Sequence, residues 1–483
     1  MSSKSSYHKI LINLIKQITK NCKLCNFLSQ IFVRYAIFCY YLSMLKRKID
    51  QVLIDWKNKK DHNPLIVYGA RQIGKTTSIR EFAKNNYESF IEINFISNPE
   101  YKDAFSSFDP NQIVNRLSLY NKDFKFIDNN TLIFFDEIQS YMDVTTSLKF
   151  FKLQGKYDVI CSGSSLGIYN QTISSVAVGF KEEYIMTTLD FEEFLWAKGY
   201  KQIQIDIIQN KMVGLIPFDK VELDVFNKLF MEYVIVGGYP RIINDYVENN
   251  NYSNTYSLQQ ELYKDYKDDI SKYLDGLDIA KALKIYESIA SQLSKENHKF
   301  QFTKIGHGAR FSSFYGCTKW IENAGICLIV NNISHLELPL KGNEDEDNFR
   351  IYFSDTALLL ASLEEDSLKD LLINKNLGVY KGAVYENIAA TCLYKQGYKL
   401  YFHRSSDSTI ELDFLLRYKD TILPIEVKAK KGRQVSLNTA LSSSNVIKQG
   451  IKFGQYNIGN NDNIITFPLF CIPFIRKYLE CSK

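Results

Sequence analysis

Short apolar runs alternate with stretches of helical periodicity over the first part of the chain. After the first run, for example, Ile79 and Phe82 recur at the spacing of one helix face. Short runs without polar alternation are typical of strands buried on both faces of a parallel sheet. The pattern therefore predicts an α/β fold with a doubly wound parallel sheet, in a domain over residues 44–189. The expected strands cover residues 64–68, 90–95, 131–135, 157–161 and 183–188.

Helical patterns continue beyond this sheet, over residues 190–278. The sequence Gly237-Gly238-Tyr239-Pro240 divides this region into two parts. Glycine and proline together are strong turn signals. We therefore interpret these four residues as a turn between two helices.

Residues 279–353 read as two helices followed by two strands, an order that suggests a winged-helix domain. Such a domain can dock DNA or contact protein. The acidic residues 344–347 are expected at the exposed tip of the wing, where they disfavour DNA on that side. Arg310, at the start of the second helix, is open to three roles: contact with a DNA phosphate, contact with a nucleotide, or a surface salt bridge. The expected elements are helices 281–294 and 312–323 and strands 326–333 and 349–353.

The stretch Gly-Ala-Arg-Gln-Ile-Gly-Lys-Thr at residues 69–76 fits the phosphate-loop pattern G-x-x-x-x-G-K-[ST], between an expected strand and an expected helix. Gly69 and Gly74 let the backbone turn its N–H groups toward a phosphate, and the helix adds the positive end of its dipole. Lys75 supplies a charge to the β- and γ-phosphates, and Thr76 offers a hydroxyl to Mg²⁺. The predicted ATP-binding residues are Gly69, Ala70, Arg71, Gln72, Ile73, Gly74, Lys75, Thr76 and Thr77.

Two acids follow the third expected strand directly, and a serine-rich turn follows the fourth. Asp136 is predicted to hold the Mg²⁺ of Mg-ATP through water, and Glu137 to orient or deprotonate the attacking water. In the turn at 162–165, Ser164 or Ser162 is a candidate sensor of the γ-phosphate. A polar side chain there would lie between that phosphate and Glu137.

A second set of acids lies near the end of the chain. A helix from Val379 carries Glu386, one strand carries Glu411 and Asp413, and the next carries Glu426 and Lys428. Strand periodicity puts Glu426 and Lys428 on one face, and Glu411 and Asp413 likewise. An acid followed by Glu-x-Lys is the divalent-metal constellation of the restriction-endonuclease-like fold. The predicted catalytic residues are Glu386, Asp413, Glu426 and Lys428, with Mg²⁺ on Asp413 and Glu426.

Taken together, these motifs resemble the prokaryotic AAA+-type P-loop ATPases that carry a conserved C-terminal domain of unknown function. The resemblance covers the chain from about Leu45 to its end. It implies that residues 190–278 form a lid over the nucleotide. The motifs are Gly-Ala-Arg-Gln-Ile-Gly-Lys-Thr at 69–76, Phe-Phe-Asp-Glu-Ile-Gln at 134–139, Ser-Gly-Ser-Ser-Leu-Gly at 162–167, Leu-Asp-Phe-Glu-Glu-Phe-Leu at 189–195, Val-Gly-Gly-Tyr-Pro at 236–240, Gly-Ala-Arg at 308–310 and Ile-Tyr-Phe-Ser-Asp-Thr at 351–356.

Charge and cysteine content bear on the partners and the cellular compartment of the protein. The chain has a formal net charge of +5, but residues 1–60 alone contribute an excess of positive charge, and the rest is slightly acidic. Overall charge therefore gives no argument for nucleic-acid binding by the body of the protein. The nine cysteines are an odd number, which argues against a disulfide framework and for a cytoplasmic protein.

Residues 1–43 form a basic and apolar N-terminal extension. Its uninterrupted apolar run, 35–45, is too short to cross a bilayer, so we do not expect a membrane span. The alternative to a loosely attached extension is that this segment contacts a membrane surface. The pair Cys22-x-x-Cys25 is a weak zinc signal, because no second pair or histidine cluster accompanies it.

The sequence therefore predicts an ATP-binding and ATP-hydrolysing AAA+-type enzyme with a C-terminal nuclease-like domain over residues 354–483, acting on or near nucleic acid. The alternative is a nucleotide-controlled switch whose C-terminal domain only binds a partner. The expected cofactors are ATP and Mg²⁺. DNA, RNA, a protein partner and a second copy of the chain are all open as partners, and Arg71, Arg241 and Arg310 are candidate arginine fingers.

Overall fold

The computed structural model describes residues 45–164, 179–274, 276–295, 298–306, 310–372, 379–405, 407, 409–428 and 435–481. Residues 47–483 form one compact unit, and everything below concerns this unit. The expectations about residues 1–43, including the Cys22-x-x-Cys25 pair, lie outside the described residues.

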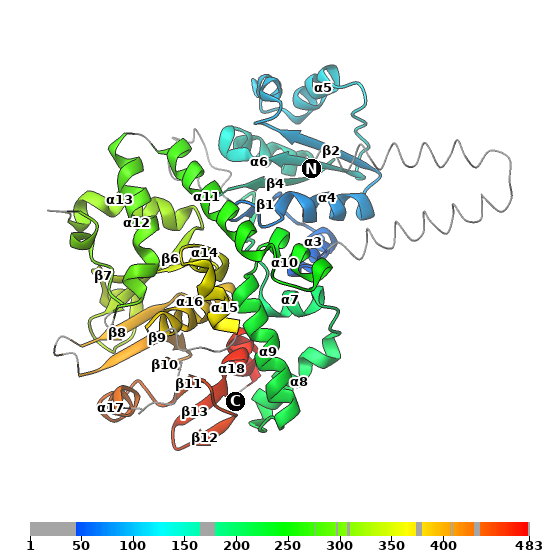
Figure 1. Ribbon diagram of the computed structural model, residues 1–483. Coiled ribbons are helices and arrows are strands. Elements are labelled where there is room, and N and C mark those ends of the chain that lie inside the picture. The colour runs from blue at the N-terminus through cyan, green and yellow to red at the C-terminus, as the bar shows by residue number, and fades with distance from the viewer. Residues whose placement is uncertain are drawn as a thin grey trace. The chain divides into compact units, whose positions relative to one another are not determined.

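The first sheet contains five parallel strands in the order β2-β3-β4-β1-β5, drawn in blue and cyan in Figure 1. This confirms the predicted parallel sheet, and each strand lies within a few residues of its expected position. The strands are β1 (Leu65–Tyr68), β2 (Ser89–Asn94), β3 (Thr131–Asp136), β4 (Asp158–Gly163) and β5 (Glu182–Ile185). The accompanying helices are α3 (Lys48–Asn58), α4 (Lys75–Asn86), α5 (Pro110–Tyr120) and α6 (Val144–Gln154).

The central strands are hydrophobic on both faces, because helices cover the sheet on each side. All residues of β1 and β3 are buried, and Ile66, Ile133 and Phe135 are fully so. Parallel strands end at the same edge of a sheet. The loop after β1, Asp136 at the end of β3 and the turn after β4 are therefore brought together at one edge.

The helical region that follows begins with a well-capped helix. Asp190 accepts a hydrogen bond from the Glu193 amide, and Glu193 accepts one from the Asp190 amide, which together form a capping box. The ammonium group of Lys48 lies 2.8 Å from Glu192. The Leu-Asp-Phe-Glu-Glu-Phe-Leu motif thus fixes the start of α3 against this region. The helices are α7 (Phe191–Ala197), α8 (Gln202–Gly214), α9 (Lys220–Val236), α10 (Pro240–Asn249) and α11 (Thr255–Tyr273).

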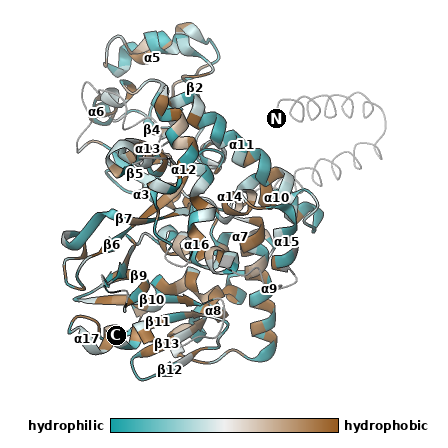
Figure 2. Cartoon of the chain, turned by 60° about the vertical axis from the view of Figure 1, so that its left-hand side comes forward, coloured by the Kyte–Doolittle hydropathy of each residue, from teal (hydrophilic) through white to brown (hydrophobic). Residues whose placement is uncertain are grey.

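The second sheet has eight strands in the order β12-β13-β11-β10-β9-β8-β6-β7, from yellow-green to red in Figure 1. Its strands are largely hydrophobic where they are buried (Figure 2). The strands are β6 (Cys327–Ile333), β7 (Glu344–Phe353), β8 (Tyr401–Arg404), β9 (Glu411–Tyr418), β10 (Thr421–Lys428), β11 (Gly450–Gly454), β12 (Gly459–Asn461) and β13 (Ile464–Pro468). The helices beyond α11 are α12 (Leu277–Leu293), α13 (Phe311–Asn323), α14 (Thr356–Ala361), α15 (Glu365–Leu372), α16 (Val379–Lys395), α17 (Val435–Ser443) and α18 (Ile475–Cys481).

The structure differs from the expected winged helix in two respects. The β6–β7 hairpin is not a separate wing, because β6 also pairs in parallel with β8 and so extends the C-terminal sheet across the expected boundary at residue 353. The acidic residues 344–347 lie in a strand rather than in a loop, because β7 begins at Glu344, and of the four only Glu346 and Asp347 are exposed. The Glu344 carboxylate accepts hydrogen bonds from Asn331 and Lys399, which satisfy its charge within the sheet.

No helix among the described residues is both long enough and apolar enough to cross a membrane.

Candidate functional site

The predicted phosphate loop joins β1 to α4 at the carboxyl edge of the parallel sheet. Gly74 adopts a left-handed conformation with φ 96°, and a Cβ atom on Gly69 would lie 2.2 Å from the Met186 carbonyl oxygen. Both positions therefore require glycine. Gln72 also has a positive φ of 62°, which is uncommon for a residue with a side chain. The loop alternates backbone conformations in the manner of an anion-binding nest.

The Lys75 ammonium group lies inside this loop. It donates hydrogen bonds to the Gly69 and Ala70 carbonyl oxygens at 2.9 and 2.7 Å. Burial lowers the pKa of Lys75 to about 8, although the carboxylates of Glu137 and Asp136 act in the opposite direction. A lysine with a depressed pKa gains most from an anionic ligand, because a phosphate would stabilise its charged form.

Asp136 is the centre of a polar cluster at the same edge. Its carboxylate is buried and accepts hydrogen bonds from Thr76 Oγ1 at 3.2 Å, Asn94 Nδ2 at 3.3 Å and Ser162 Oγ. The hydroxyl of Thr76 and the carboxylate of Asp136 are oxygen ligands within reach of one small cation. These residues fit Mg²⁺, which prefers oxygen ligands and keeps several waters.

Glu137 follows with a left-handed backbone, φ 57°, and its carboxylate accepts a hydrogen bond from Gln139 Nε2. Gln139 Oε1 in turn accepts a hydrogen bond from the Ser164 amide at 3.1 Å. Of the two candidate sensors, Ser162 contacts Asp136, whereas the buried Ser164 hydroxyl makes no hydrogen bond within the described part of the chain. Gln139 was missed as a linking residue, although it stands in the Phe-Phe-Asp-Glu-Ile-Gln motif.

The three candidate arginine fingers are placed differently. Arg71 forms an ion pair with Asp269 on α11 at 2.6 Å, within the same chain. Arg241 pairs with Glu261 at 2.7 Å on the surface, and Arg310 is exposed.

The C-terminal residues are brought together by antiparallel pairing of β9 with β10. The register pairs Phe414 with Ile425, and its continuation sets Asp413 opposite Glu426 on one face. Lys428 Nζ lies 3.7 Å from Asp413 Oδ2 and 3.8 Å from Glu426 Oε2. Asp413 also accepts a hydrogen bond from the Val427 amide at 2.9 Å, which fixes its carboxylate between the two strands.

Glu386, on α16, is held by residues that the sequence did not single out. His298 Nδ1 lies 3.0 Å and Arg350 Nη1 lies 3.6 Å from Glu386 Oε2, and the Tyr352 hydroxyl donates to the same oxygen at 3.1 Å. Arg350 is fully buried and also contacts Glu411 at 2.5 Å. Arg350 and Tyr352 stand on β7, so the hairpin once expected as a wing contributes to this site.

The pKa values of the carboxylates at this site are shifted in different directions. Burial raises the pKa of Glu426 to about 7, and Lys428 only partly offsets this. Burial also raises the pKa of Asp413. At Glu386 burial acts in the same direction, but His298 and Arg350 outweigh it and hold the pKa at about 2. Among the described residues, no group of three His, Cys, Asp or Glu side chains is close enough together to hold a metal ion. Asp413, Glu426 and Lys428 thus fit the two-acid part of the predicted constellation, whereas Glu386 is paired with His298 and Arg350.

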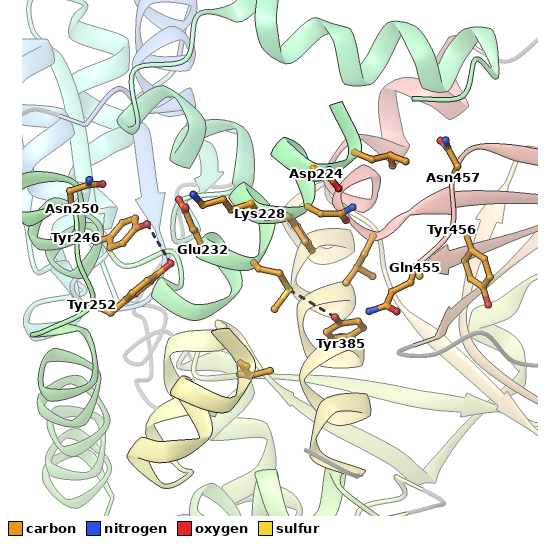
Figure 3. Close-up of a pocket in the computed structure, with 17 residues that line it drawn as sticks. Asp224, Lys228, Glu232, Tyr246, Asn250, Tyr252, Tyr385, Gln455, Tyr456 and Asn457 are labelled. Carbon is orange, nitrogen blue, oxygen red and sulfur yellow. Dashed lines mark hydrogen bonds between the residues drawn. The ribbon is translucent and has the colours of Figure 1, made fainter. Parts of the chain in front are cut away.

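A pocket of about 960 Å³ lies apart from both sites, between α9, α10, α16 and the loop after β11 (Figure 3). Its tyrosine hydroxyls Tyr246 and Tyr252 are 3.4 Å apart, and Glu232 forms an ion pair with Lys198 at 3.0 Å. None of the predicted site residues lines it.

Comparison with known families divides the chain into three matched segments. Residues 61–195 match the AAA domain family, residues 227–369 a domain of unknown function (DUF8612), and residues 381–471 a second domain of unknown function (DUF4143). The first match includes the phosphate loop, Asp136 and Glu137. The chain therefore contains a P-loop ATPase domain of the AAA+ type. The last matched segment includes Glu386, Asp413, Glu426 and Lys428. Its family has no assigned function.

No curated protein matches the chain. Among solved structures, the chain is similar to the Aeropyrum pernix Orc1 protein in complex with DNA, at 12% identity and a TM-score of 0.30 over 68% of this chain and 91% of that one. It is also similar to the Thermotoga maritima RuvB Holliday junction branch migration motor, at 10% identity and a TM-score of 0.29 over 69% and 95%. Similarity at this level establishes no function.

Proposed function

We propose that the protein binds and hydrolyses ATP with Mg²⁺ at the phosphate loop. The observation that carries this proposal is the convergence of Lys75, Thr76, Asp136 and Ser162 at one edge of the parallel sheet. Thr76 and Asp136 would hold Mg²⁺, which neutralises phosphate charge when it is bound. Lys75 binds the β- and γ-phosphates, and Glu137 orients or deprotonates the attacking water.

The direct test is phosphate release from ATP by the purified full-length protein, titrated with Mg²⁺ and repeated with DNA or RNA present. Mg²⁺-dependent turnover supports the proposal. Stimulation by a nucleic acid would identify the class of partner, whereas the absence of turnover and of ATP binding would refute the nucleotide assignment.

We further propose that the C-terminal site hydrolyses phosphodiester bonds of nucleic acid. The support is the cross-strand grouping of Asp413, Glu426 and Lys428. The two carboxylates would hold Mg²⁺, which acts as a Lewis acid when it is bound, and the Lys428 ammonium would polarise the attacking water. Cleavage of plasmid DNA or of RNA, measured with Mg²⁺ or Mn²⁺ and again with a chelator, tests this activity.

A second candidate function, a switch with an inactive C-terminal binding module, has its own support. Lys428 lies near two carboxylates, and Arg350 lies near two others, Glu386 and Glu411. These two cations offset part of the charge of the four carboxylates without a metal ion. Titration with Mn²⁺ separates the two candidates, because a binding module of this kind would take up no cation at Asp413 and Glu426.

A further inference from the structure

The phosphate loop can bind phosphate only while its amide groups face inward. In a trans peptide the carbonyl of one residue and the N–H of the next point in opposite directions. A carbonyl that is held on the outer side of the loop therefore turns the next N–H toward the inside. Groups that hydrogen-bond to the outward carbonyls would therefore influence the affinity of the loop for a nucleotide.

Two such carbonyls have buried partners. Arg47 Nη1 donates to the Ile73 carbonyl oxygen at 2.7 Å, so the Gly74 N–H points away from Arg47. The Tyr266 hydroxyl donates to the Arg71 carbonyl oxygen at 3.1 Å, so the Gln72 N–H points away from Tyr266. Both orientations turn amides of the loop toward the side where a phosphate would bind.

Arg47 is itself rigidly held. It is 6% exposed, and its other nitrogens donate to the Thr187 carbonyl oxygen at 2.8 Å and to Glu193 Oε1 at 3.0 Å. Its guanidinium thus joins the loop to the segment that follows β5 and to the start of α7. A planar, always charged group with several donors suits such a three-way contact, and a lysine could not reproduce it.

Tyr266 belongs to a buried chain of hydroxyls that begins in the Gly-Gly-Tyr-Pro motif. The Tyr239 hydroxyl donates to the Tyr266 hydroxyl at 2.9 Å, and both side chains are buried. Tyr239 is fixed in turn, because the preceding Gly238 amide donates to the Asp355 carboxylate at 3.0 Å. A Cβ atom on Gly237 would lie only 2.5 Å from that carboxylate. The motif is a turn between helices, as expected, and it also positions Tyr239.

Helix α11 adds two further contacts to the strained part of the loop. Gln72 Nε2 donates to Asp265 at 2.7 Å, and Arg71 pairs with Asp269 at 2.6 Å. Both views of the molecule place α11 beside the parallel sheet (Figures 1 and 2). The left-handed Gln72 is therefore held from outside by the helix that carries Tyr266.

We propose that Arg47 and Tyr266 are positioning residues for the nucleotide: they brace the outer side of the phosphate loop so that the Gly74 and Gln72 amides face the phosphates. This inference rests on the proposed ATP binding. It also makes α11 a fixed support of the loop, and it gives the Gly-Gly-Tyr-Pro motif a role in nucleotide affinity.

The test compares Tyr266→Phe and Arg47→Met with Tyr252→Phe in the full-length protein. Tyr252→Phe is the matched control, because it also removes a hydroxyl bonded to another tyrosine, Tyr246, but one that has no contact with the loop. The measurements are the Kd for Mg-ATP, the KM and kcat for turnover, and hydrogen exchange of the segment 69–77 without nucleotide. Loss of a neutral hydrogen bond predicts a Kd raised about 3- to 10-fold in Tyr266→Phe, with KM rising and kcat nearly unchanged.

Faster exchange of the loop in Tyr266→Phe, but not in Tyr252→Phe, is also expected. Arg47→Met should weaken binding more. Because Arg47→Met removes the ion-pair partner of the buried Glu193, the folding of this variant is checked by thermal melting. If Arg47→Met fails to fold, Tyr266→Phe alone decides the case. An unchanged Kd and unchanged hydrogen exchange in folded Tyr266→Phe would refute the proposal that Tyr266 positions the loop. A wild-type protein that binds ATP without hydrolysing it would refute the proposed hydrolysis, but it would not contradict the proposed role of Arg47 and Tyr266.

Discussion

The two candidate sites of this protein are built in opposite ways. At the phosphate loop, the hydrogen bonds that the Lys75 ammonium makes with described residues go to backbone carbonyls of the loop, so its charge can still pair with an anion. At the C-terminal site, the Lys428 and Arg350 cations already lie next to carboxylates. The first site is prepared for an anionic ligand that brings its own cation. At the second site, the carboxylates proposed to hold a metal already lie next to a cationic side chain.

This difference also appears in the pKa values. Burial without a close carboxylate partner leaves the pKa of Lys75 depressed, to about 8. Burial beside a second acid leaves the pKa of Glu426 raised, to about 7. Each site therefore contains one group whose charged form a ligand would stabilise, but the two groups have opposite signs.

The largest expected effect is the loss of nucleotide binding in Lys75→Ala. Lys75 is expected to bring a positive charge to the β- and γ-phosphates, so its removal should weaken Mg-ATP binding by about 100-fold or more. Lys84→Ala, on the same helix but at its far end, is the control. Equilibrium binding of ATP measures the effect, and near-normal affinity in Lys75→Ala would contradict the nucleotide assignment.

Glu137→Gln should separate binding from chemistry at the same site. The amide keeps the size of the side chain but cannot accept a proton, so turnover should fall by about 10²- to 10⁴-fold while Mg-ATP still binds through Lys75, Thr76 and Asp136. Steady-state turnover and a binding titration on one preparation check this. Loss of binding in Glu137→Gln would mean that Glu137 is structural and the base lies elsewhere.

At the C-terminal site, Asp413→Asn and Lys428→Met should fail in different ways. Asp413→Asn removes a metal ligand, so Mn²⁺ uptake and nucleic-acid cleavage should both be lost, whereas Lys428→Met should keep the metal and lose cleavage. Calorimetric titration with Mn²⁺ and a plasmid cleavage assay distinguish these outcomes, and ATP turnover should be unchanged in both variants. If the wild-type protein takes up no Mn²⁺ and cuts neither DNA nor RNA, the C-terminal domain is a binding module.

The smallest effect is also the sharpest test of the contrast, because the two sites should respond to pH in opposite directions. Mg-ATP favours the protonated form of Lys75, so its affinity should be level below the pKa of about 8 and fall as pH rises above it. A metal needs Glu426 ionised, so Mn²⁺ affinity should rise as pH increases through the pKa of about 7.

The fall in Mg-ATP affinity should approach about tenfold per pH unit well above the pKa of Lys75, about 8. The rise in Mn²⁺ affinity should approach about tenfold per pH unit well below the pKa of Glu426, about 7, and level off above it, so titrations from about pH 5 to about pH 9.5 cover both ranges. Lys75→Ala provides the control for the first profile and Glu426→Gln for the second. Two parallel profiles would show that neither assigned group controls its site.

The sequence by itself determined the candidate nucleotide site and the class of the first domain. Strand, loop and helix around residues 69–76 are consecutive, and Asp136 follows a buried strand directly, so local patterns define both. The common edge of a parallel sheet then requires that they meet. A sequence pattern carries information about residues that are close together in the chain. For this reason the strands of the parallel sheet could be predicted nearly correctly.

The tertiary structure alone decided the rest. The sequence placed Glu411 with Asp413 and Glu426 with Lys428, but only the β9–β10 register joins the two pairs on one face. The partners of Glu386 and of the phosphate loop come from segments far away in the chain, and neither periodicity nor motif spacing identifies them. The β6–β7 hairpin joins the second sheet for the same reason: which strand edges meet depends on packing between distant segments, which no single stretch of sequence specifies. Those distant contacts supplied Arg350, His298, Arg47 and Tyr266.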